Sequence, residues 1–240
     1  MSDFVLACDV DGTLWPGDSI LEIFGQYGKR KQADLIWKKS CENPDGLARI
    51  LGVDRSRIYP SFDVEWVLED ILKTRPIPLD VFRDTADSVE FFPGVVSVFA
   101  FLQDLGIESF LLSTGYQPFL ERICEKLSIP KENAAGTRLK IRGDSVIGFV
   151  GPVMEGKEKE AAVRGISRKT GIALSRFIGI GDSATDKWFL KAISDAGGLA
   201  IAVSENSELL SYVKPNLALK SPDFKRISGE IEEFSQVNPK

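Results

Sequence analysis

Two carboxylates stand two residues apart directly after a short apolar run near the start of the chain. The run 4–8 leads into Asp9-Val10-Asp11-Gly12-Thr13. A run of this length is typical of a buried parallel strand, and Asp and Gly are also ordinary turn residues. Alternate residues of an extended chain point the same way, so Asp9 and Asp11 can address one ligand. Because two close like charges are costly unless a cation or a shared proton relieves them, the pair predicts a bound metal ion.

Two further stretches place polar groups after an apolar run. Ser113-Thr114-Gly115 follows the run 109–112, and Asp182 follows the run 177–181. In parallel sheets the ligand crevice lies just past the carboxyl ends of the strands. We therefore expect these groups to join the two aspartates at one edge of a sheet, as in other α/β active sites.

Histidine is absent from all 240 residues. Its absence excludes nucleophilic triads built on imidazole, zinc sites that require it and histidine-ligated two-metal phosphatase centres. Acid–base chemistry near neutral pH must then come from carboxylates, lysine, cysteine or tyrosine, and the Asp9/Asp11 pair is the leading candidate.

The elements that must position these groups fall into two kinds. From residue 15 to about 90 the periodicity is helical, with a capping box at Ser19-Ile20-Leu21-Glu22 and further helices at 33–39, 64–72 and 79–89. Strands and helices then alternate. The predicted strands are 109–113, 177–181, 199–203 and 217–219. The predicted helices are 95–105, one that begins at Pro118, 158–170 and one after Ser221-Pro222. A hairpin is predicted from residues 140–142 and 146–149.

This pattern predicts an α/β fold in which a helical segment interrupts a Rossmann-like parallel sheet after its first strand. We expect residues 1–15 and 91–240 to form the core domain and residues 16–90 to form a smaller helical domain.

Four motifs in order resemble the haloacid dehalogenase-like phosphohydrolase superfamily. That superfamily combines Asp-x-Asp after a strand, a strand ending in Ser or Thr, a helix-borne Lys, and Gly-Asp-x₃-Asp after another strand. Here these are Asp9/Asp11, Ser113, Lys157 or Lys159, and Gly181-Asp182-Ser183-Ala184-Thr185-Asp186. The resemblance covers the chain apart from the segment 16–90, which stands where the family inserts a helical cap.

The resemblance implies Mg²⁺ and a small-molecule phosphomonoester substrate. Asp9 would be the nucleophile that forms an aspartyl phosphate, and Asp11 would be the acid and then the base. The metal would be held by Asp9, by Asp182 and by the backbone carbonyl of Asp11. Asp186 would support these ligands without binding the metal itself. Ser113-Thr114-Gly115 and a lysine would hold the phosphoryl oxygens.

The phosphoserine phosphatase branch is the most similar. In that branch, the number of residues between the lysine and the Gly-Asp pair matches the separation of Lys159 from Gly181-Asp182, which favours Lys159. We expect Lys157 to be solvated. Asp18 stands where that branch carries an acid facing the substrate amino group, although it also suits a loop or a helix start. Thr185 replaces the Asn of that branch. No arginine is assigned to a substrate carboxylate, although Arg49, Arg55 and Arg57 are available. Trp15, Trp37 and Trp66 are expected to pack inside the cap.

Composition limits the other classes of function. The net charge is −5 with no basic block, so binding to nucleic acid has no electrostatic support. No apolar stretch reaches membrane-spanning length, the start of the chain lacks a basic signal-peptide region, and three scattered cysteines suit a reducing cytoplasm. We expect a cytoplasmic phosphatase. A phosphotransferase or mutase using the same aspartate, and a non-enzymatic phospho-accepting regulator, remain open, as does the oligomeric state.

Overall fold

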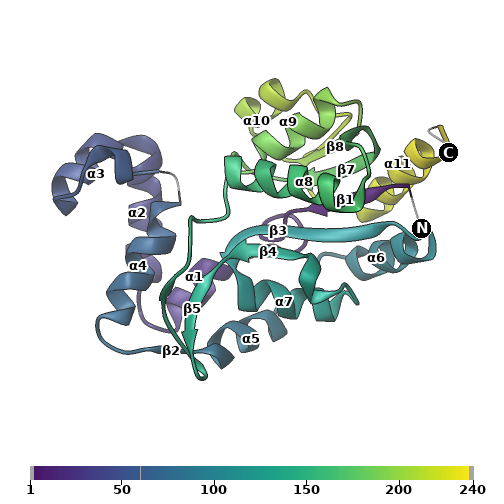
Figure 1. The fold of residues 1–240 in the computed structure, drawn as a ribbon. Helices are drawn as coiled ribbons and strands as arrows, with labels where there is room; N and C mark the ends of the chain where they lie inside the picture. Colours follow the sequence, from purple (N-terminus) through teal and green to yellow (C-terminus); the bar gives the residue numbers. More distant parts are fainter. Residues whose placement is uncertain (1–2, 60, 238–240) are drawn as a thin grey trace.

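The computed structural model describes residues 3–59 and 61–237. Its centre is a six-stranded parallel sheet in the order β4-β3-β1-β7-β8-β9 (Figure 1). The strands are Val5–Cys8 (β1), Glu108–Tyr116 (β3), Ala134–Thr137 (β4), Phe177–Gly181 (β7), Leu199–Val203 (β8) and Leu217–Leu219 (β9). The predicted α/β fold with a Rossmann-like parallel core is confirmed.

Helices cover both faces of this sheet. Leu6 and Cys8 of β1 belong to a core that also contains residues of α6 (Val95–Asp104) and α11 (Phe224–Val237). Val5 and Ala7 belong to a second core, built with α8 (Lys157–Thr170), α9 (Lys187–Asp195) and α10 (Ser207–Val213). Because alternate residues of β1 are buried on opposite faces, the strand is apolar throughout, and the chain turns polar only where β1 ends, at Asp9.

Residues between β1 and α6 are mainly helical, as predicted. The helices are Ser19–Gly25 (α1), Arg30–Glu42 (α2), Pro44–Leu51 (α3), Phe62–Leu72 (α4) and Leu79–Asp87 (α5), with a short 3₁₀ turn at Arg55–Arg57. α3 and the 3₁₀ turn were not predicted. α3 is short, and its start depends on one capping contact, from the Gly46 N–H to the Asn43 side chain at 3.0 Å.

The predicted capping box of α1 is wrong. The N-cap is Asp18, whose carboxylate accepts a hydrogen bond from the backbone N–H of Leu21 at 3.0 Å. Ser19 is instead the first helical residue, and its hydroxyl donates to Asp11 at 2.7 Å. The sequence holds two good cap residues in succession, and the contact with Asp11 decides which of them enters the helix.

The predicted hairpin is present and forms part of a small second sheet. β5 (Leu139–Arg142) and β6 (Ser145–Phe149) pair antiparallel, and β2 (Ile77–Pro78) pairs with β6. This sheet, in the order β2-β6-β5, therefore contains strands from both predicted domains. The division at residues 15/16 and 90/91 stays a prediction. β2 was not predicted, since two residues are too few to show alternation.

Other differences from the sequence-based prediction lie at edges and ends. β3 continues past Ser113 to Tyr116, with a register shift against β4 between Leu112 and Tyr116. β4, α9 and α10 were not predicted. β4 is Ala-Ala-Gly-Thr at the edge of the sheet, and these small residues carry little strand propensity.

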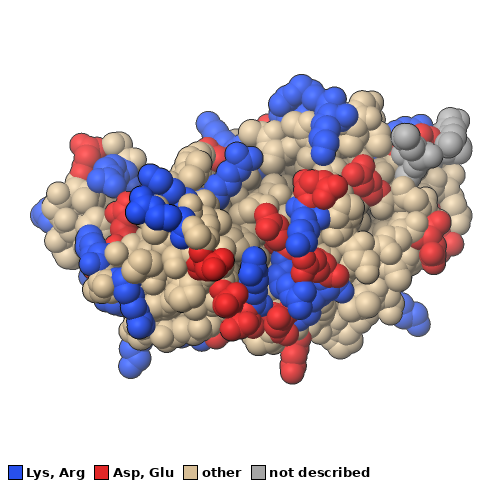
Figure 2. Space-filling model, turned by 60° about the horizontal axis from the view of Figure 1, so that its bottom comes forward, with Lys and Arg blue, Asp and Glu red and all other residues tan. Residues whose placement is uncertain are grey.

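Charged side chains of both signs are interspersed on the face where α5 and α7 (Gln117–Lys126) lie (Figure 2). Arg122 of α7 pairs with Asp87 of α5 at 2.7 Å and with Glu125 at 2.6 Å. Exposed pairs of this kind add little stability, so the packing of α5 on α7 depends mainly on apolar burial.

No helix in the described residues has both the length and the apolar composition needed to cross a bilayer. All three cysteines are free thiols: Cys8 and Cys124 are buried, as predicted for Cys8, and Cys41 is exposed.

Candidate active site

Asp9 leaves β1 in a buried position. Its backbone N–H donates to the carbonyl of Ile180 in β7 at 2.9 Å, so the parallel ladder continues one residue beyond the strand. Asp9 is 4% exposed. A carboxylate this deeply buried needs a positive partner.

Lys159 in the first turn of α8 is that partner. Its Nζ lies 2.7 Å from Asp9 Oδ1 and 2.6 Å from Asp186 Oδ1, and the residue is 1% exposed. Lys157, one of the two alternatives in the sequence, is exposed, and its Nζ lies 5.6 Å from the ring centroid of Trp188. The two lysines thus point to different surroundings, as expected for helix positions two apart.

The loop after β7 carries Asp182 and is held by Asp186. Asp186 Oδ2 accepts hydrogen bonds from the backbone N–H groups of Asp182 at 3.1 Å and Ser183 at 3.0 Å, and from Ser183 Oγ at 3.1 Å. Both oxygens of Asp186 are therefore engaged, one by the loop and one by Lys159. A Cβ on Gly181 would lie 2.8 Å from Asp186 Cβ, so this close approach requires glycine.

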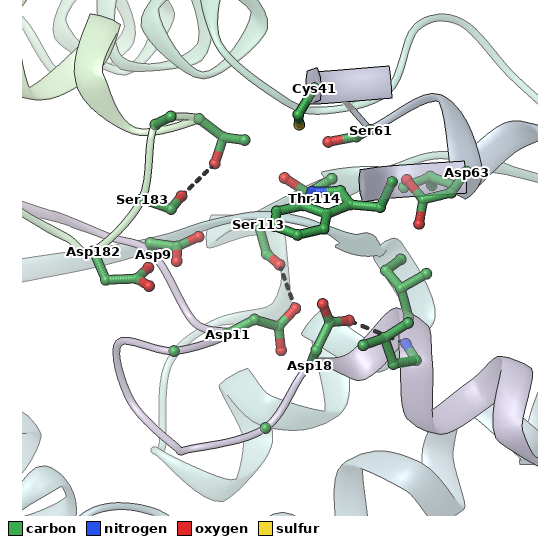
Figure 3. Close-up of a pocket in the computed structure, with 18 of the residues that line it drawn as sticks. Asp9, Asp11, Asp18, Cys41, Ser61, Asp63, Ser113, Thr114, Asp182 and Ser183 are labelled. Atoms are coloured by element: carbon green, nitrogen blue, oxygen red, sulfur yellow. Dashed lines mark hydrogen bonds between the residues drawn. The ribbon is translucent and has the colours of Figure 1, made fainter. Parts of the chain in front are cut away.

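Three carboxylates converge at this point. One oxygen from each of Asp9, Asp182 and Asp186 lies within 4.8 Å of the others. Thr13 Oγ1 lies between two of them, 3.3 Å from Asp9 Oδ2 and 3.2 Å from Asp182 Oδ1. Figure 3 shows Asp9 and Asp182 side by side on one side of the pocket.

The electrostatics of this cluster call for a second cation. Burial raises the pKa of Asp9 to about 6, and the charge of Asp186 adds to this rise. Burial likewise raises the pKa of Asp182 to about 9, with further contributions from Asp9 and Asp186. The ammonium of Lys159 balances only part of this charge. A divalent metal ion that prefers carboxylate oxygens fits the donor set.

Asp11 has a different environment. Its Oδ1 accepts from Trp15 Nε1 at 2.9 Å and from the Ser19 N–H at 3.1 Å, and its Oδ2 accepts from Ser19 Oγ at 2.7 Å. Burial raises the pKa of Asp11 to about 7, and the nearby charge of Asp18 raises it further. A carboxyl with a pKa near neutrality, held by fixed donors, suits proton transfer in both directions.

The segment Ser113-Thr114-Gly115 lies in the second half of β3. Ser113 Oγ donates to Asp11 Oδ2 at 3.4 Å and accepts from the Gly115 N–H at 2.9 Å. Ser113 and Thr114 line the pocket. A Cβ on Gly115 would lie 2.6 Å from Ser19 Oγ, so this glycine allows α1 to approach the site.

These groups face a cavity of about 470 Å³ between the core and the helical segment (Figure 3). The core contributes Asp9, Asp11, Ser113 and Asp182. Lining residues from the helical segment include Asp18, which the sequence singled out, and others that it did not: Arg30, Cys41, Ser61 and Asp63.

Trp37 also lines the cavity and is 54% exposed, so the expectation that it packs inside the helical segment is wrong. Trp15 is buried, but its ring centroid lies 6.3 Å from that of Phe119 in α7, outside the helical segment in which it was expected to pack. The arginines that the sequence left available for a substrate carboxylate (Arg49, Arg55 and Arg57) are not among the described lining residues.

A family model for haloacid dehalogenase-like hydrolases matches residues 6–191, which is most of the chain. The chain belongs to this family. Within it, the phosphoserine phosphatase-like branch indicated by the sequence is supported by named relatives. Phosphoserine phosphatase SerB2 of Mycobacterium tuberculosis is 23% identical over 215 residues, covering 89% of this chain and 47% of the relative. The mouse phosphoserine phosphatase is 30% identical over 144 residues, covering 59% of this chain and 61% of the relative. The alignments thus span about half of the length of these haloacid dehalogenase-like relatives.

Solved structures of the family share the fold. A phospho-aspartyl intermediate analogue of phosphoserine phosphatase superposes with a TM-score of 0.69 at 20% identity, covering 96% of this chain and 99% of that one. A haloacid dehalogenase-like hydrolase from Salmonella enterica superposes with a TM-score of 0.71 at 19% identity, covering 94% of this chain and 70% of that one. At these identities the likeness establishes the arrangement of the elements.

Proposed function

We propose that this chain is a Mg²⁺-dependent hydrolase of a small-molecule phosphomonoester that acts through an aspartyl-phosphate intermediate. One observation carries the proposal: buried Asp9 contacts Lys159 beside Asp182, in a pocket whose wall holds a second carboxyl, Asp11. The phosphoserine phosphatases among the relatives support a phosphomonoester as the substrate class. The free cysteines suit a reducing compartment, and the cytoplasm is the proposed location.

Asp9, Asp182 and the backbone carbonyl of Asp11 would hold Mg²⁺. When bound, the ion neutralises charge on the phosphoryl oxygens and on the carboxylates. Asp186 acts through other residues: both of its oxygens are used to hold Lys159 and the loop of Asp182. Removing it would misplace the site without removing a group that touches the substrate.

Asp9 is the nucleophile. A carboxylate oxygen of Asp9 attacks phosphorus, a new P–O bond forms, and the bond between phosphorus and the leaving oxygen breaks. Asp11 gives its proton to that oxygen, so the leaving group departs as a neutral alcohol. Water then attacks the phosphorus of the aspartyl phosphate, Asp11 takes a proton from it, and the bond to Asp9 breaks to release phosphate.

The phosphoryl oxygens are held by Ser113, Thr114 and Lys159. The Gly115 N–H is already donated to Ser113 Oγ, so Gly115 acts by orienting that hydroxyl and by leaving room for Ser19. Fixed donors aimed at the transferring group stabilise charge without reorganisation during the reaction.

Residues 16–90 act as the cap over this site. Asp18 lies on the cap side of the pocket and faces the leaving group of the substrate, while its Oδ1 also caps α1. A cap that closes on the substrate excludes bulk water and strengthens the interactions inside.

The test is phosphate release from a panel of phosphomonoesters that includes phosphoserine and p-nitrophenyl phosphate, with Mg²⁺ and with EDTA. We expect Mg²⁺-dependent release and a loss of at least about 10³-fold in Asp9→Asn, as for removal of other enzymatic nucleophiles. An Asp9→Asn protein that works at the wild-type rate would refute the proposal. Release of the alcohol without free phosphate, when an acceptor alcohol is added, would instead identify a phosphotransferase.

A further inference from the structure

The pocket has a second charged end, formed by the cap. Asp18 at the start of α1 and Asp63 in the first turn of α4 lie on the same side of the cavity, across from Asp9 and Asp182 (Figure 3). This end receives the leaving group if the phosphoryl group is held at Asp9, so its assignment rests on the proposed function.

Asp63 is the feature that the hydrolytic mechanism does not use. It lines the cavity but is only 5% exposed. Its Oδ1 is buried and has no hydrogen-bond partner among the described residues. A buried carboxylate oxygen without a donor is costly, so the site is incomplete until a ligand supplies one.

The surroundings of Asp63 are negative. Burial raises its pKa to about 8, and the charges of Asp18 and Glu155 raise it further, although the first backbone N–H groups of α4 act in the opposite direction. Two carboxyl groups, Asp18 and Asp63, thus line this end of the cavity, and the charge of Glu155 acts on Asp63 from nearby. A positive ligand group would relieve their repulsion, whereas a ligand carboxylate would add to it.

Positive side chains do little to offset this charge. Arg30 is the single Lys or Arg among the described residues that line the cavity. Its guanidinium is bound to Glu22 at 2.8 Å and is about half exposed. The ammonium of Lys159 is already shared between Asp9 and Asp186.

Trp37 adds an aromatic wall at the same cavity. It comes from α2 of the cap, lines the pocket and is 54% exposed, which is unusual for so large an apolar side chain. An indole and carboxyl groups that line one cavity form a combination that attracts an ammonium group.

We propose that the substrate is an aminoalkyl phosphate: its leaving group carries an ammonium that donates to Asp63 and faces Asp18 and Trp37, and it carries no carboxylate. The cation supplies the donor that Asp63 lacks. A zwitterionic leaving group such as that of phosphoserine brings no net positive charge to this acidic end, and the one cationic side chain among the described lining residues, Arg30, is already paired with Glu22.

The test compares ligands that differ only at this end. We would measure kcat/KM with Mg²⁺ for phosphoethanolamine, for phosphoserine and for propyl phosphate, a neutral analogue of similar size. We expect phosphoethanolamine to exceed each of the other two by about tenfold or more, which is the effect of one additional hydrogen bond to a charged group. Equal values, or a preference for phosphoserine, would overturn the proposal.

Asp63→Asn should bring the ratio of phosphoethanolamine to propyl phosphate close to one. The matched control is Asp80→Asn: Asp80 has the same first-turn position in α5, but its side chain is 78% exposed and pairs with Arg83. We expect the control to keep the wild-type ratio. An Asp63→Asn protein that also keeps it would overturn the role of Asp63. If that variant does not fold, the wild-type comparison of substrates decides.

Failure of this inference is distinguishable from failure of the proposed function. Mg²⁺-dependent hydrolysis of p-nitrophenyl phosphate without an advantage for phosphoethanolamine would support the phosphatase activity and refute the proposed ammonium site. If no phosphomonoester is hydrolysed, calorimetric titration of the wild-type protein with phosphoethanolamine and with propyl phosphate still decides. Tighter binding of the amine by about tenfold supports the site, and equal binding refutes it.

Discussion

Lys159 holds the buried carboxylates of Asp9 and Asp186 together, and replacing it should lower the free energy of unfolding by an amount that depends on pH. In Lys159→Met the apolar part of the side chain is kept, but its ion pairs with Asp9 and Asp186, at 2.7 and 2.6 Å, are lost. All three residues are at most 4% exposed, so water does not replace the ammonium. Removing one partner of a buried ion pair destabilises a protein by about 3–5 kcal/mol.

The assay is thermal and urea unfolding in EDTA, so that bound metal is not a variable. For a chain of this size the loss corresponds to a fall in Tm of about 6–20 °C, at about 2–4 °C per kcal/mol. The matched control is Lys157→Met, two residues away on the same helix, where the side chain is exposed and lies over Trp188. We expect this control to lose less than about 1 kcal/mol.

The pH dependence has a definite sign. The pKa of Asp9 is about 6 in the folded protein, above its ordinary value of 3.8, so ionisation of Asp9 opposes folding as pH rises through this window. Without the ammonium this pKa rises further, and the penalty extends to higher pH. The loss in Lys159→Met should therefore be smallest near pH 4–5 and largest at pH 8. A loss below about 1 kcal/mol, or one that does not shrink as the pH falls, would refute this account of the buried cluster.

Three further predictions concern the same site. Asp11→Asn should lower the rate of phosphorylation of Asp9 about 10²–10⁴-fold for an alkyl phosphate but much less for p-nitrophenyl phosphate, whose leaving group needs no proton; hydrolysis of the aspartyl phosphate should slow equally for both, and the pre-steady-state burst of each alcohol checks this. Gly181→Ala should cost about 1–3 kcal/mol in urea unfolding, because the new methyl group meets Asp186 Cβ at 2.8 Å. Mg²⁺ at about 100 times its Kd should stabilise the wild-type protein by about 2.7 kcal/mol in a thermal melt, and Asp182→Asn should abolish this gain.

The functional groups of the core could be predicted because each of them follows the end of a single strand. Asp9 and Asp182 each follow a continuous apolar run, and parallel strands bring such positions to one edge of the sheet whatever the loops do. Lys159 could be assigned only through the resemblance to a family. Its burial depends on the packing of α8 beside β1, which no local pattern reveals.

The cap was predictable as a set of helices but not as a binding surface. Asp63 in its sequence context is an acid in the first turn of a helix, which is a common and purely structural feature. Trp37 was expected inside because large aromatic side chains are usually buried. Nothing in the sequence distinguishes an aromatic side chain that faces the core of the helical segment from one that faces the cavity. The 3₁₀ turn, α3 and β2 are too short to leave a pattern of their own.

The two ends of the cavity differ in how their charge is balanced. This difference bears on whether substrate choice can change while the phosphoryl chemistry stays the same. At the core end, the ammonium of Lys159 pairs with Asp9 and Asp186, and the proposed metal ligands Asp9 and Asp182 follow neighbouring strands of the sheet. At the cap end, Asp63 Oδ1 has no hydrogen-bond partner among the described residues. The phosphoryl group is common to all phosphomonoesters, so the core end does not distinguish between them, whereas a buried carboxylate oxygen without a donor selects its ligand by charge. Substrate choice in this chain should therefore change with substitutions in α1, α2 and α4 while the phosphoryl chemistry of the core stays the same.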